Sequence, residues 1–482
     1  MNYSVVIYIL GWIMEIEAAF LALPGIVSAI YGESGGFAFL WVALGSAVAG
    51  SMIILHKPKN MRFYLREGFV TVALSWILMS VIGCLPFVIN GDIPHFADAL
   101  FEMISGFTTT GATVVSDVEG LTKGSLFWRS FSHWIGGMGV LVFLLAIVPM
   151  AGGSHMNLMK AESPGPSVGK LVPKVRQTAK YLYIIYFTLT MIEVIFLLFG
   201  GMNLFEALTT SFGTAGTGGF AIWNDGFVSV SPYNQWVVTI FMLLFGVNFG
   251  FYFLILTGKL RDALKFEEVR IYFIIVIAAA VFIFINLRHF ALYAPVEGIR
   301  QAFFQVASII TTTGFASADF NLWPETSRTI LVLLMFIGAC AGSTGGGIKV
   351  SRFIIACKSF IKEIISYLHP RSVKKIKIEG KPLEHETLRA TNVYFMTYMV
   401  IFAVSVLLVS IENKDLVTNF AAVAATFNNI GPGLSLVGPM ANFGHFTDFT
   451  KYILMFDMLA GRLEIFPMML LFCPAVWKRR RA

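Results

Sequence analysis

The sequence contains few charged residues. Asp, Glu, Lys and Arg together make up 13% of its 482 residues, whereas a soluble domain carries roughly 25%. Hydrophobic residues make up 57%, and apolar runs of about 18 or more residues, the length of a transmembrane helix, recur along the whole chain. Because the strands of a membrane barrel alternate apolar and polar residues and these runs do not, the sequence predicts an all-α polytopic membrane protein.

Cysteines and catalytic patterns are also scarce. The four cysteines lie apart in apolar segments, with no CxxC spacing and no paired histidine, which argues against a disulfide framework and a metal cluster. The sequence has no HExxH, no nucleophile–base pair and no acidic metal cluster, so we do not expect an enzyme. The first apolar run is not preceded by a basic segment, and we interpret it as a membrane span and not as a signal peptide.

The net charge is +7, but the positive charges are unevenly distributed. Every second region between predicted helices is basic, which argues against a nucleic-acid partner and predicts that these regions and both termini are cytoplasmic. Part of this basic surface is a candidate for contacts with anionic lipid or with a partner protein, and regions 151–180 and 352–390 are the candidate partner surfaces. Most of the 35 Lys and Arg fall in residues 56–70, 151–180, 258–270, 352–390 and 478–481.

Four stretches of 14 residues align without a gap, and each ends on a glycine. Each begins with a polar residue that can cap a helix and continues with an apolar body of about ten residues, which is too short to span a bilayer. A long apolar helix is predicted before each stretch and another after it, so one unit is repeated four times in the same orientation. The stretches are DALFEMISGFTTTG (98–111), EALTTSFGTAGTGG (206–219), QAFFQVASIITTTG (301–314) and TNFAAVAATFNNIG (418–431).

The predicted architecture therefore has ten transmembrane helices. Two form an N-terminal hairpin near 3–31 and 37–55. The helices before the short stretches are predicted near 69–89, 182–200, 269–287 and 390–411, and those after them near 126–150, 235–256, 329–355 and 452–472. The corresponding divisions are the hairpin with its basic loop (1–68) and four pore repeats, at 69–178, 179–268, 269–388 and 389–482.

A half-length helix followed by Thr/Gly backbone is unusual inside a membrane protein. Irregular backbone leaves carbonyls unpaired, which is tolerated only where it is buried in protein or lines a water-filled cavity. The negative end of the helix dipole favours a cation there, and the following carbonyls can replace the hydration shell of an alkali ion. Glycine allows the backbone to turn these carbonyls inward. Ordinary loops between helices are the alternative, but four gap-free copies favour one filter around a common axis.

Two further features lie inside predicted spans. Residues 337–352 (IGACAGSTGGGIKVSR) place Gly345, Gly346 and Gly347 within a span, where we predict a break in the helix, with close helix packing as the alternative. A nucleotide-binding P-loop is not expected, because the spacing to Lys349 does not fit and no strand precedes the glycines. Arg462 lies near the middle of the last span, where a charge is either functional or paired, here with Asp457 or Glu464. His133 stands alone, and we expect a structural role for it.

The order helix, short helix, glycine, helix, repeated four times, resembles the Trk/Ktr/HKT superfamily of potassium transporters. TTTGAT, TGGF, TTGF and GPG, together with the N-terminal hairpin, are similar to its TrkH branch. The resemblance implies that the four glycines are filter glycines, that Gly345, Gly346, Gly347 and Lys349 belong to a flexible intramembrane gate, and that Arg462 is an electrostatic barrier beside it. The implied potassium-filter residues are Thr109, Thr110, Gly111, Gly218, Gly219, Thr312, Thr313, Gly314, Asn429, Ile430 and Gly431.

The resemblance also implies the setting of the protein. Potassium is the transported ion, and no organic cofactor is expected in this chain. The expected assembly is a homodimer in the bacterial inner membrane, bound to a TrkA-like cytosolic regulatory ring that carries NAD(H) or ATP. The alternative is a secondary transporter that couples potassium to sodium or protons; such proteins usually show midplane carboxylates and inverted repeats, whereas these repeats are parallel.

Overall fold

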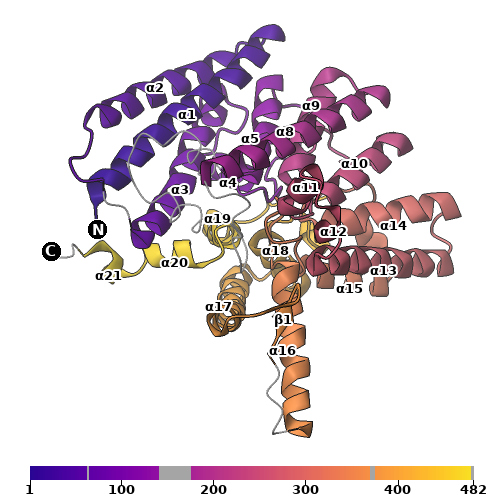
Figure 1. Ribbon diagram of the computed structural model, residues 1–482. Coiled ribbons are helices and arrows are strands. Elements are labelled where there is room, and N and C mark those ends of the chain that lie inside the picture. The colour runs from indigo at the N-terminus through magenta and orange to yellow at the C-terminus, as the bar shows by residue number, and fades with distance from the viewer. Residues whose placement is uncertain (62–63, 140–174, 370–374, 479–482) are drawn as a thin grey trace.

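The computed structural model describes residues 1–61, 64–139, 175–369 and 375–478. The regular secondary structure of the described residues is helical except for a short hairpin of two strands, β1 (Lys377–Ile378) and β2 (Lys381–Pro382). The N-terminal helices α1 (Tyr3–Ile30) and α2 (Gly36–Leu55) pack closely side by side (Figure 1). A Cβ on Gly50 would lie 2.9 Å from the carbonyl oxygen of Gly11, so small residues set this close approach. The all-helical fold class predicted from the sequence is confirmed.

The remaining helices follow the repeated order predicted from the sequence. Four long helices are each followed by a short one and then by a second apolar segment. The long helices are α3 (Leu65–Asn90), α8 (Val175–Phe199), α13 (Glu267–His289) and α17 (His385–Val409). The short helices are α4 (Phe96–Phe107), α9 (Leu204–Gly216), α14 (Pro295–Ile310) and α18 (Leu416–Phe427).

The second segment of three copies is described to its end, and in each of these copies it consists of two helices and not of one continuous helix. The prediction of single helices over 235–256 and 452–472 is wrong, the 329–355 span contains the break that was predicted within it, and the predicted 126–150 helix extends beyond the described residues. Breaks occur at Gly246–Asn248, in the glycine-rich residues 336–349 and at Leu463–Ile465. The segments are α5 (Lys123–Gly137), α10 (Pro232–Phe245) with α11 (Phe249–Leu256), α15 (Glu325–Met335) with α16 (Val350–Leu368), and α19 (Asp448–Arg462) with α20 (Phe466–Leu471).

These breaks change the count of spans. Among the described residues, six helices are long and apolar enough to cross a membrane, or seven if α10 and α11, which meet at an angle of 89°, form one span. The predicted count of ten continuous spans is therefore not confirmed. Asn248 accepts a hydrogen bond from the Gly250 N–H at 2.7 Å and so starts a new helix after the bend. The break at 246–248 was not predicted, because apolar residues continue on both sides of it.

Each short helix begins a few residues before the polar residue that was predicted to start it. In the second copy Asn203 is the cap, and Glu206 accepts a hydrogen bond from the Asn203 N–H at 3.1 Å, completing a capping box. In the fourth copy Asp415 accepts a hydrogen bond from the Thr418 N–H at 3.0 Å. The Thr418 hydroxyl and N–H both donate to this carboxylate and hold the pKa of Asp415 below its ordinary value. Each of these two short helices is thereby fixed at its first turn.

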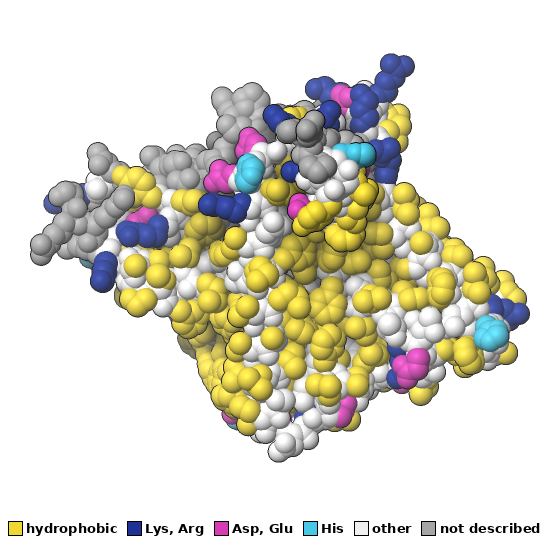
Figure 2. Space-filling view, turned by 90° about the horizontal axis from the view of Figure 1, so that it is seen from below, with side chains coloured by type: hydrophobic (Ala, Val, Ile, Leu, Met, Phe, Trp, Pro, Cys, Tyr) yellow, Lys and Arg dark blue, Asp and Glu magenta, His cyan; other side chains and the backbone are white. Residues whose placement is uncertain are grey.

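The outer surface of the helices is apolar. Figure 2 shows a face covered mainly by hydrophobic side chains, with Lys and Arg gathered toward its edges. On α2, Trp41 is 68% exposed and Met52 is 62% exposed, an arrangement that suits contact with lipid and not with water. The first residues lie against the last described ones, since the Met1 ammonium donates to the Lys478 carbonyl at 3.4 Å and Tyr3 stacks on Trp477. Residues near the two termini therefore lie on the same side of the molecule.

Candidate ion-binding site

All four short helices end in the same backbone motif. In the first copy, the Thr109 N–H donates to the Gly106 carbonyl at 3.1 Å and the Thr110 N–H donates to the Ser105 carbonyl at 2.9 Å. This pair of bonds is the Schellman motif. The same two bonds end α9, α14 and α18. The four copies therefore share one backbone geometry in addition to their sequence similarity.

The motif requires a left-handed residue, and here that residue is not glycine. Thr109, Thr217, Thr312 and Asn429 occupy the position, with φ between 54° and 60°. A positive φ is unfavourable for threonine, which is β-branched, and such residues persist where the surrounding structure holds them. The glycine two positions later also has a positive φ in every copy, between 77° and 95°. We refer to residues 108–111, 216–219, 311–314 and 428–431 as ring segments 1 to 4.

The ring segments form a closed cycle. A Cβ placed on each terminal glycine would collide with the carbonyl oxygen of the residue before the glycine in the next segment. The collisions are Gly111 with Gly218 O (2.0 Å), Gly219 with Thr313 O (2.0 Å), Gly314 with Ile430 O (1.8 Å) and Gly431 with Thr110 O (2.7 Å). The four glycines also line one cavity of about 130 Å³. Stretches far apart in the sequence thus meet at one centre, with only glycine fitting at each junction.

Side chains in ring segments 1, 3 and 4 bond to one another or to the helices behind them. Thr108 Oγ1 lies 2.8 Å from Thr110 Oγ1 in segment 1, and Thr311 Oγ1 lies 2.7 Å from Thr313 Oγ1 in segment 3. In segment 4, Asn429 Nδ2 donates to Thr110 Oγ1 at 2.9 Å, which joins segments 4 and 1. These hydrogen bonds hold the hydroxyl groups of Thr108, Thr110, Thr311 and Thr313 in place.

Close helix packing supports the ring from behind. A Cβ on Gly136 of α5 would lie 1.9 Å from the carbonyl oxygen of Phe107, at the end of α4. The fourth copy repeats this, since a Cβ on Gly461 of α19 would lie 2.1 Å from the Phe427 carbonyl oxygen. The glycine allows the second helix of the copy to touch the end of the short helix directly.

Replacing Gly136 with alanine is therefore expected to destabilise the protein by about 1–3 kcal/mol, the usual cost of overpacking a well-packed interior. The measurement is thermal unfolding of the detergent-solubilised protein. Gly45→Ala on α2 is the control, since a Cβ there would meet nothing within 4 Å. Equal melting temperatures for the two variants would contradict the packing argument.

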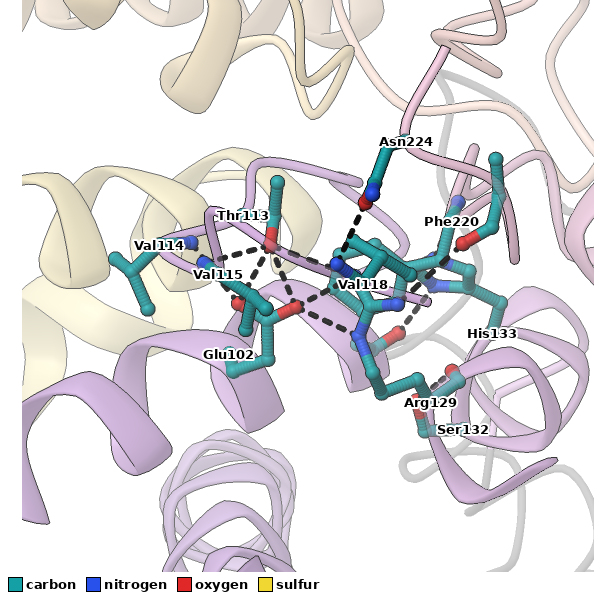
Figure 3. Close-up of polar contacts among 12 residues, drawn as sticks. Glu102, Thr113, Val114, Val115, Val118, Arg129, Ser132, His133, Phe220 and Asn224 are labelled. Carbon is teal, nitrogen blue, oxygen red and sulfur yellow. Dashed lines mark hydrogen bonds and ion pairs between the residues drawn. The ribbon is translucent and has the colours of Figure 1, made fainter. Parts of the chain in front are cut away.

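A buried ion pair lies against the residues that follow ring segment 1 (Figure 3). Arg129 of α5 and Glu102 of α4 are both almost fully buried, with Nη2 2.7 Å and Nε 2.8 Å from Oε1 of Glu102. The Glu102 carboxylate also accepts hydrogen bonds from Thr113 Oγ1 at 2.9 Å and from the Val114 N–H at 3.1 Å. Sequence reasoning missed this pair, because its members lie 27 residues apart in apolar surroundings.

His133 lies on the same helix and bridges two copies. Its Nε2 accepts a hydrogen bond from the Phe220 N–H at 3.2 Å, so its other nitrogen, Nδ1, carries the proton and donates to the Gly106 carbonyl at 2.7 Å. The histidine is fully buried. This geometry suits the structural role predicted for His133.

Residues 336–349, here called the glycine loop, interrupt the second segment of the third copy and lie against the ring. The Gly346 N–H donates to Thr312 Oγ1 at 2.6 Å. A Cβ on Gly345 would lie 3.0 Å from the Thr311 carbonyl oxygen, and one on Gly346 would lie 2.9 Å from that of Asn428. The glycine loop therefore touches ring segments 3 and 4, and its glycines permit the contact. The predicted break in this helix is present and extends beyond the three consecutive glycines.

Polar groups hold the glycine loop in place. Lys349 Nζ is buried and donates to the Gly345 and Gly346 carbonyls. Glu268 of α13 accepts hydrogen bonds at one oxygen from the Ala341 N–H (2.7 Å), within the loop, and from the Ser351 N–H (2.9 Å), in the first turn of α16. Burying backbone amides and carbonyls without partners would be costly in a membrane. Glu268, which the sequence analysis did not single out, supplies two of those partners.

Arg462, at the end of α19, joins the glycine loop to the end of α5. Its guanidinium donates to the Thr344 carbonyl at 2.8 Å and to the Gly136 and Gly137 carbonyls at 2.6 and 3.1 Å. The two acids considered as local partners make other contacts: Glu464 pairs with Arg352, and Asp457 accepts from Ser405 Oγ at 2.7 Å. The structure thus brings the predicted gate residues Gly345–Gly347, Lys349 and Arg462 together beneath the ring.

Comparisons with known proteins agree over nearly the full length of the chain. The family model for TrkH, described as a cation transport protein, matches residues 37–479. The Trk system potassium uptake protein TrkH of Escherichia coli K12 is 36% identical, with 99% of this chain and 100% of that protein aligned. The corresponding values for TrkG of the same strain are 31%, 99% and 99%.

A solved structure gives the same result. The crystal structure of the potassium transporter TrkH from Vibrio parahaemolyticus matches this fold with a TM-score of 0.87 and 32% identity, over 99% of this chain and 100% of that one. This agreement covers the N-terminal hairpin and all four copies described above. The chain belongs to the TrkH family of cation transport proteins.

Proposed function

We propose that this protein is a potassium uptake subunit in which the four ring segments form the selectivity filter. The closed cycle of glycine-to-carbonyl contacts is the observation that carries the proposal. Four short helices direct the negative ends of their dipoles at one centre, which favours a cation there. Main-chain oxygens at that centre can replace the water that a potassium ion loses on entering. The relatives named above as potassium uptake proteins support the choice of ion.

The glycine loop and Arg462 form the proposed gate. Support comes from their position: the loop lies against ring segments 3 and 4, and the arginine holds the loop through the Thr344 carbonyl. A guanidinium below a cation filter opposes passage by charge, and the loop narrows the path by volume. Movement of either group would change both barriers, because the arginine is bonded to the loop.

Regulation and assembly belong to the same proposal. We infer a homodimer in the bacterial cytoplasmic membrane, with both termini cytoplasmic and a TrkA-like nucleotide-binding ring on the cytosolic side. Support comes from the family and from the basic regions 151–180 and 352–390. The helix α16, which follows the glycine loop directly, projects away from the helical body (Figure 1). A partner that moves α16 would therefore act on the loop.

Flux into liposomes that contain the purified protein tests the proposed function. We expect entry of K⁺ and Rb⁺ down a gradient and much slower entry of Na⁺ and Li⁺. Equal rates for K⁺ and Li⁺ would reject a selective filter. Protein-free liposomes give the background.

Coupling to sodium or protons is the second candidate. Its supporting observation is that α1, α8 and α19 carry the buried carboxylic acids Glu17, Glu193 and Asp457, a feature typical of coupled transporters. The same liposomes separate the two candidates. Uptake driven by membrane potential alone, at equal pH and without sodium, supports the uncoupled pathway, whereas uptake that requires a proton or sodium gradient supports coupling.

A further inference from the structure

We propose that Arg129, held by Glu102, is a positioning residue that fixes ring segment 2 from the first copy and thereby sets ion selectivity. This inference rests on the proposed function of the ring as a filter. It assigns a role to a buried ion pair that the proposed filter and gate do not use.

Ring segment 2 is the most glycine-rich of the four. It reads Gly216–Thr217–Gly218–Gly219, whereas each of the other three contains a single glycine. Glycine loses more conformational freedom on folding than any other residue, so this segment is the costliest to hold in one conformation. Its one side chain with a hydroxyl, Thr217, donates to the carbonyl of its own neighbour Gly216 at 2.6 Å. The segment therefore depends on groups from outside.

Those outside groups come from α5 of the first copy. Arg129 Nη1 lies 3.4 Å from the Ala221 carbonyl oxygen, and the Arg129 guanidinium carbon lies 4.1 Å from the centre of the Phe220 ring. His133 accepts the hydrogen bond from the Phe220 N–H, and its ring fills the space where a side chain on Gly218 would lie. The residues on either side of Gly219 are thus held by two side chains one turn apart on α5.

Glu102 determines where the guanidinium lies. Its carboxylate accepts hydrogen bonds from two nitrogens of Arg129, and also from Thr113 and Val114, residues that follow ring segment 1. The resulting chain of contacts runs from the backbone after segment 1, through Glu102 and Arg129, to the backbone after segment 2. An arginine is suited to this position because its planar group bonds a carboxylate and stacks on an aromatic ring at once.

Comparison of the four copies shows that the fold of a copy does not require this ion pair. In the gap-free alignment, Glu102 corresponds to Thr210, Gln305 and Ala422. Arg129 is the seventh residue after the cap of its helix, and the same position holds a fully buried apolar residue in each of the other copies. These residues are Val238, Leu331 and Leu454. A buried ion pair is weak evidence for stability, because an apolar replacement of both members is often neutral or stabilising.

The third copy supplies the matched variant. Its pair, Gln305 and Leu331, suggests the double substitution Glu102→Gln/Arg129→Leu, which removes both charges and leaves none buried alone. The introduced glutamine keeps a side-chain oxygen that can accept the hydrogen bond that Thr113 Oγ1 donates to Glu102. The guanidinium link to segment 2 is lost.

Arg129→Lys is the second variant. It keeps the positive charge that faces Glu102. It lacks the planar group that stacks on Phe220 and reaches the Ala221 carbonyl, because a lysine ammonium is a point charge on a flexible stem. This variant therefore separates the charge of the pair from its contacts with the backbone after segment 2.

The experiment measures K⁺ and Na⁺ fluxes in liposomes that contain wild-type protein or a variant, with thermal unfolding of each protein in detergent. We expect both variants to fold and carry K⁺, while the ratio of K⁺ to Na⁺ flux falls about tenfold, a change of about 1.4 kcal/mol. Glu297→Gln/Arg300→Leu removes another Glu–Arg pair, 3.9 Å apart at the start of α14, and should keep the wild-type ratio.

The outcomes separate this inference from the proposed function. A wild-type ratio in either variant would overturn the role of Arg129, even with normal filter behaviour in the wild type. If the double variant does not fold, Arg129→Lys alone decides the matter. A wild-type protein that passes K⁺ and Na⁺ equally would instead refute the proposed filter and the inference together.

Discussion

Replacing Gly111 with serine is expected to remove most of the discrimination between K⁺ and Na⁺. A Cβ at this position would lie 2.0 Å from the carbonyl oxygen of Gly218, and the φ of 77° is unfavourable for a side chain. The carbonyl must move, and an ion-binding ring depends on the position of each of its oxygens. We expect the ratio of K⁺ to Na⁺ flux to fall by at least about tenfold, equivalent to about 1.4 kcal/mol.

The control for this experiment is a serine in a place without neighbours. Gly45→Ser on α2 adds the same side chain where nothing lies within 4 Å, and it should keep both the flux and the ratio. Folding of the two variants is compared by thermal unfolding in detergent. An unchanged ion ratio in well-folded Gly111→Ser would count against the assignment of ring segment 1 to a filter.

Removing the guanidinium of Arg462 should raise the flux of K⁺ in the absence of any regulatory partner. Arg462→Ala deletes the hydrogen bonds to Thr344, Gly136 and Gly137 together with the positive charge below the ring. Deletion within Gly345–Gly347 should act in the same direction, because the loop then loses its contact with ring segments 3 and 4. A rise of roughly tenfold would correspond to a barrier lowered by about 1.4 kcal/mol.

Arg261→Ala is the control, because it removes one positive charge, as Arg462→Ala does, but outside the ring segments and the glycine loop. This arginine lies on the short helix α12 (Leu260–Ala263) and is exposed, so its loss should leave the basal flux as it is. Flux that stays level or decreases in folded Arg462→Ala protein, with the loop deletion giving the same result, would remove the gate from the proposal. Selectivity is measured in parallel, because a gate residue should alter the rate more than the ion ratio.

The glycines of the ring could be predicted because repetition in the sequence marks them. Four copies aligned without gaps identify Gly111 and its three counterparts, and the structure brings all four to one cavity. The left-handed threonines could not be predicted, since local preference places glycine at a positive φ. Thr109, Thr217 and Thr312 hold this conformation because the end of each short helix is enclosed by the other copies. Tertiary packing there overrides the local preference.

The supporting contacts were harder to predict than the ring itself. Glu102 and Arg129 are close only because α4 and α5 fold back on each other, and a single sequence gives no sign of that pairing. Glu268 meets the glycine loop across 73 residues of chain. Gly246 and Asn248 stand at the break between α10 and α11, but the apolar residues on both sides of them favour one continuous span. Composition predicts the membrane and repetition predicts the ring, but contacts between helices have no local pattern.

The four quarters of this ring are encoded separately in one gene. In a channel built from four identical subunits, one codon change alters all four quarters of the ring together, so every substitution acts at four positions at once. Here a single substitution, such as one at Asn429, changes one quarter and leaves three as they were. A quarter that differs from the other three, as segment 2 does with its three glycines, can therefore be supported by a neighbouring copy, as His133 does by accepting the hydrogen bond from the Phe220 N–H.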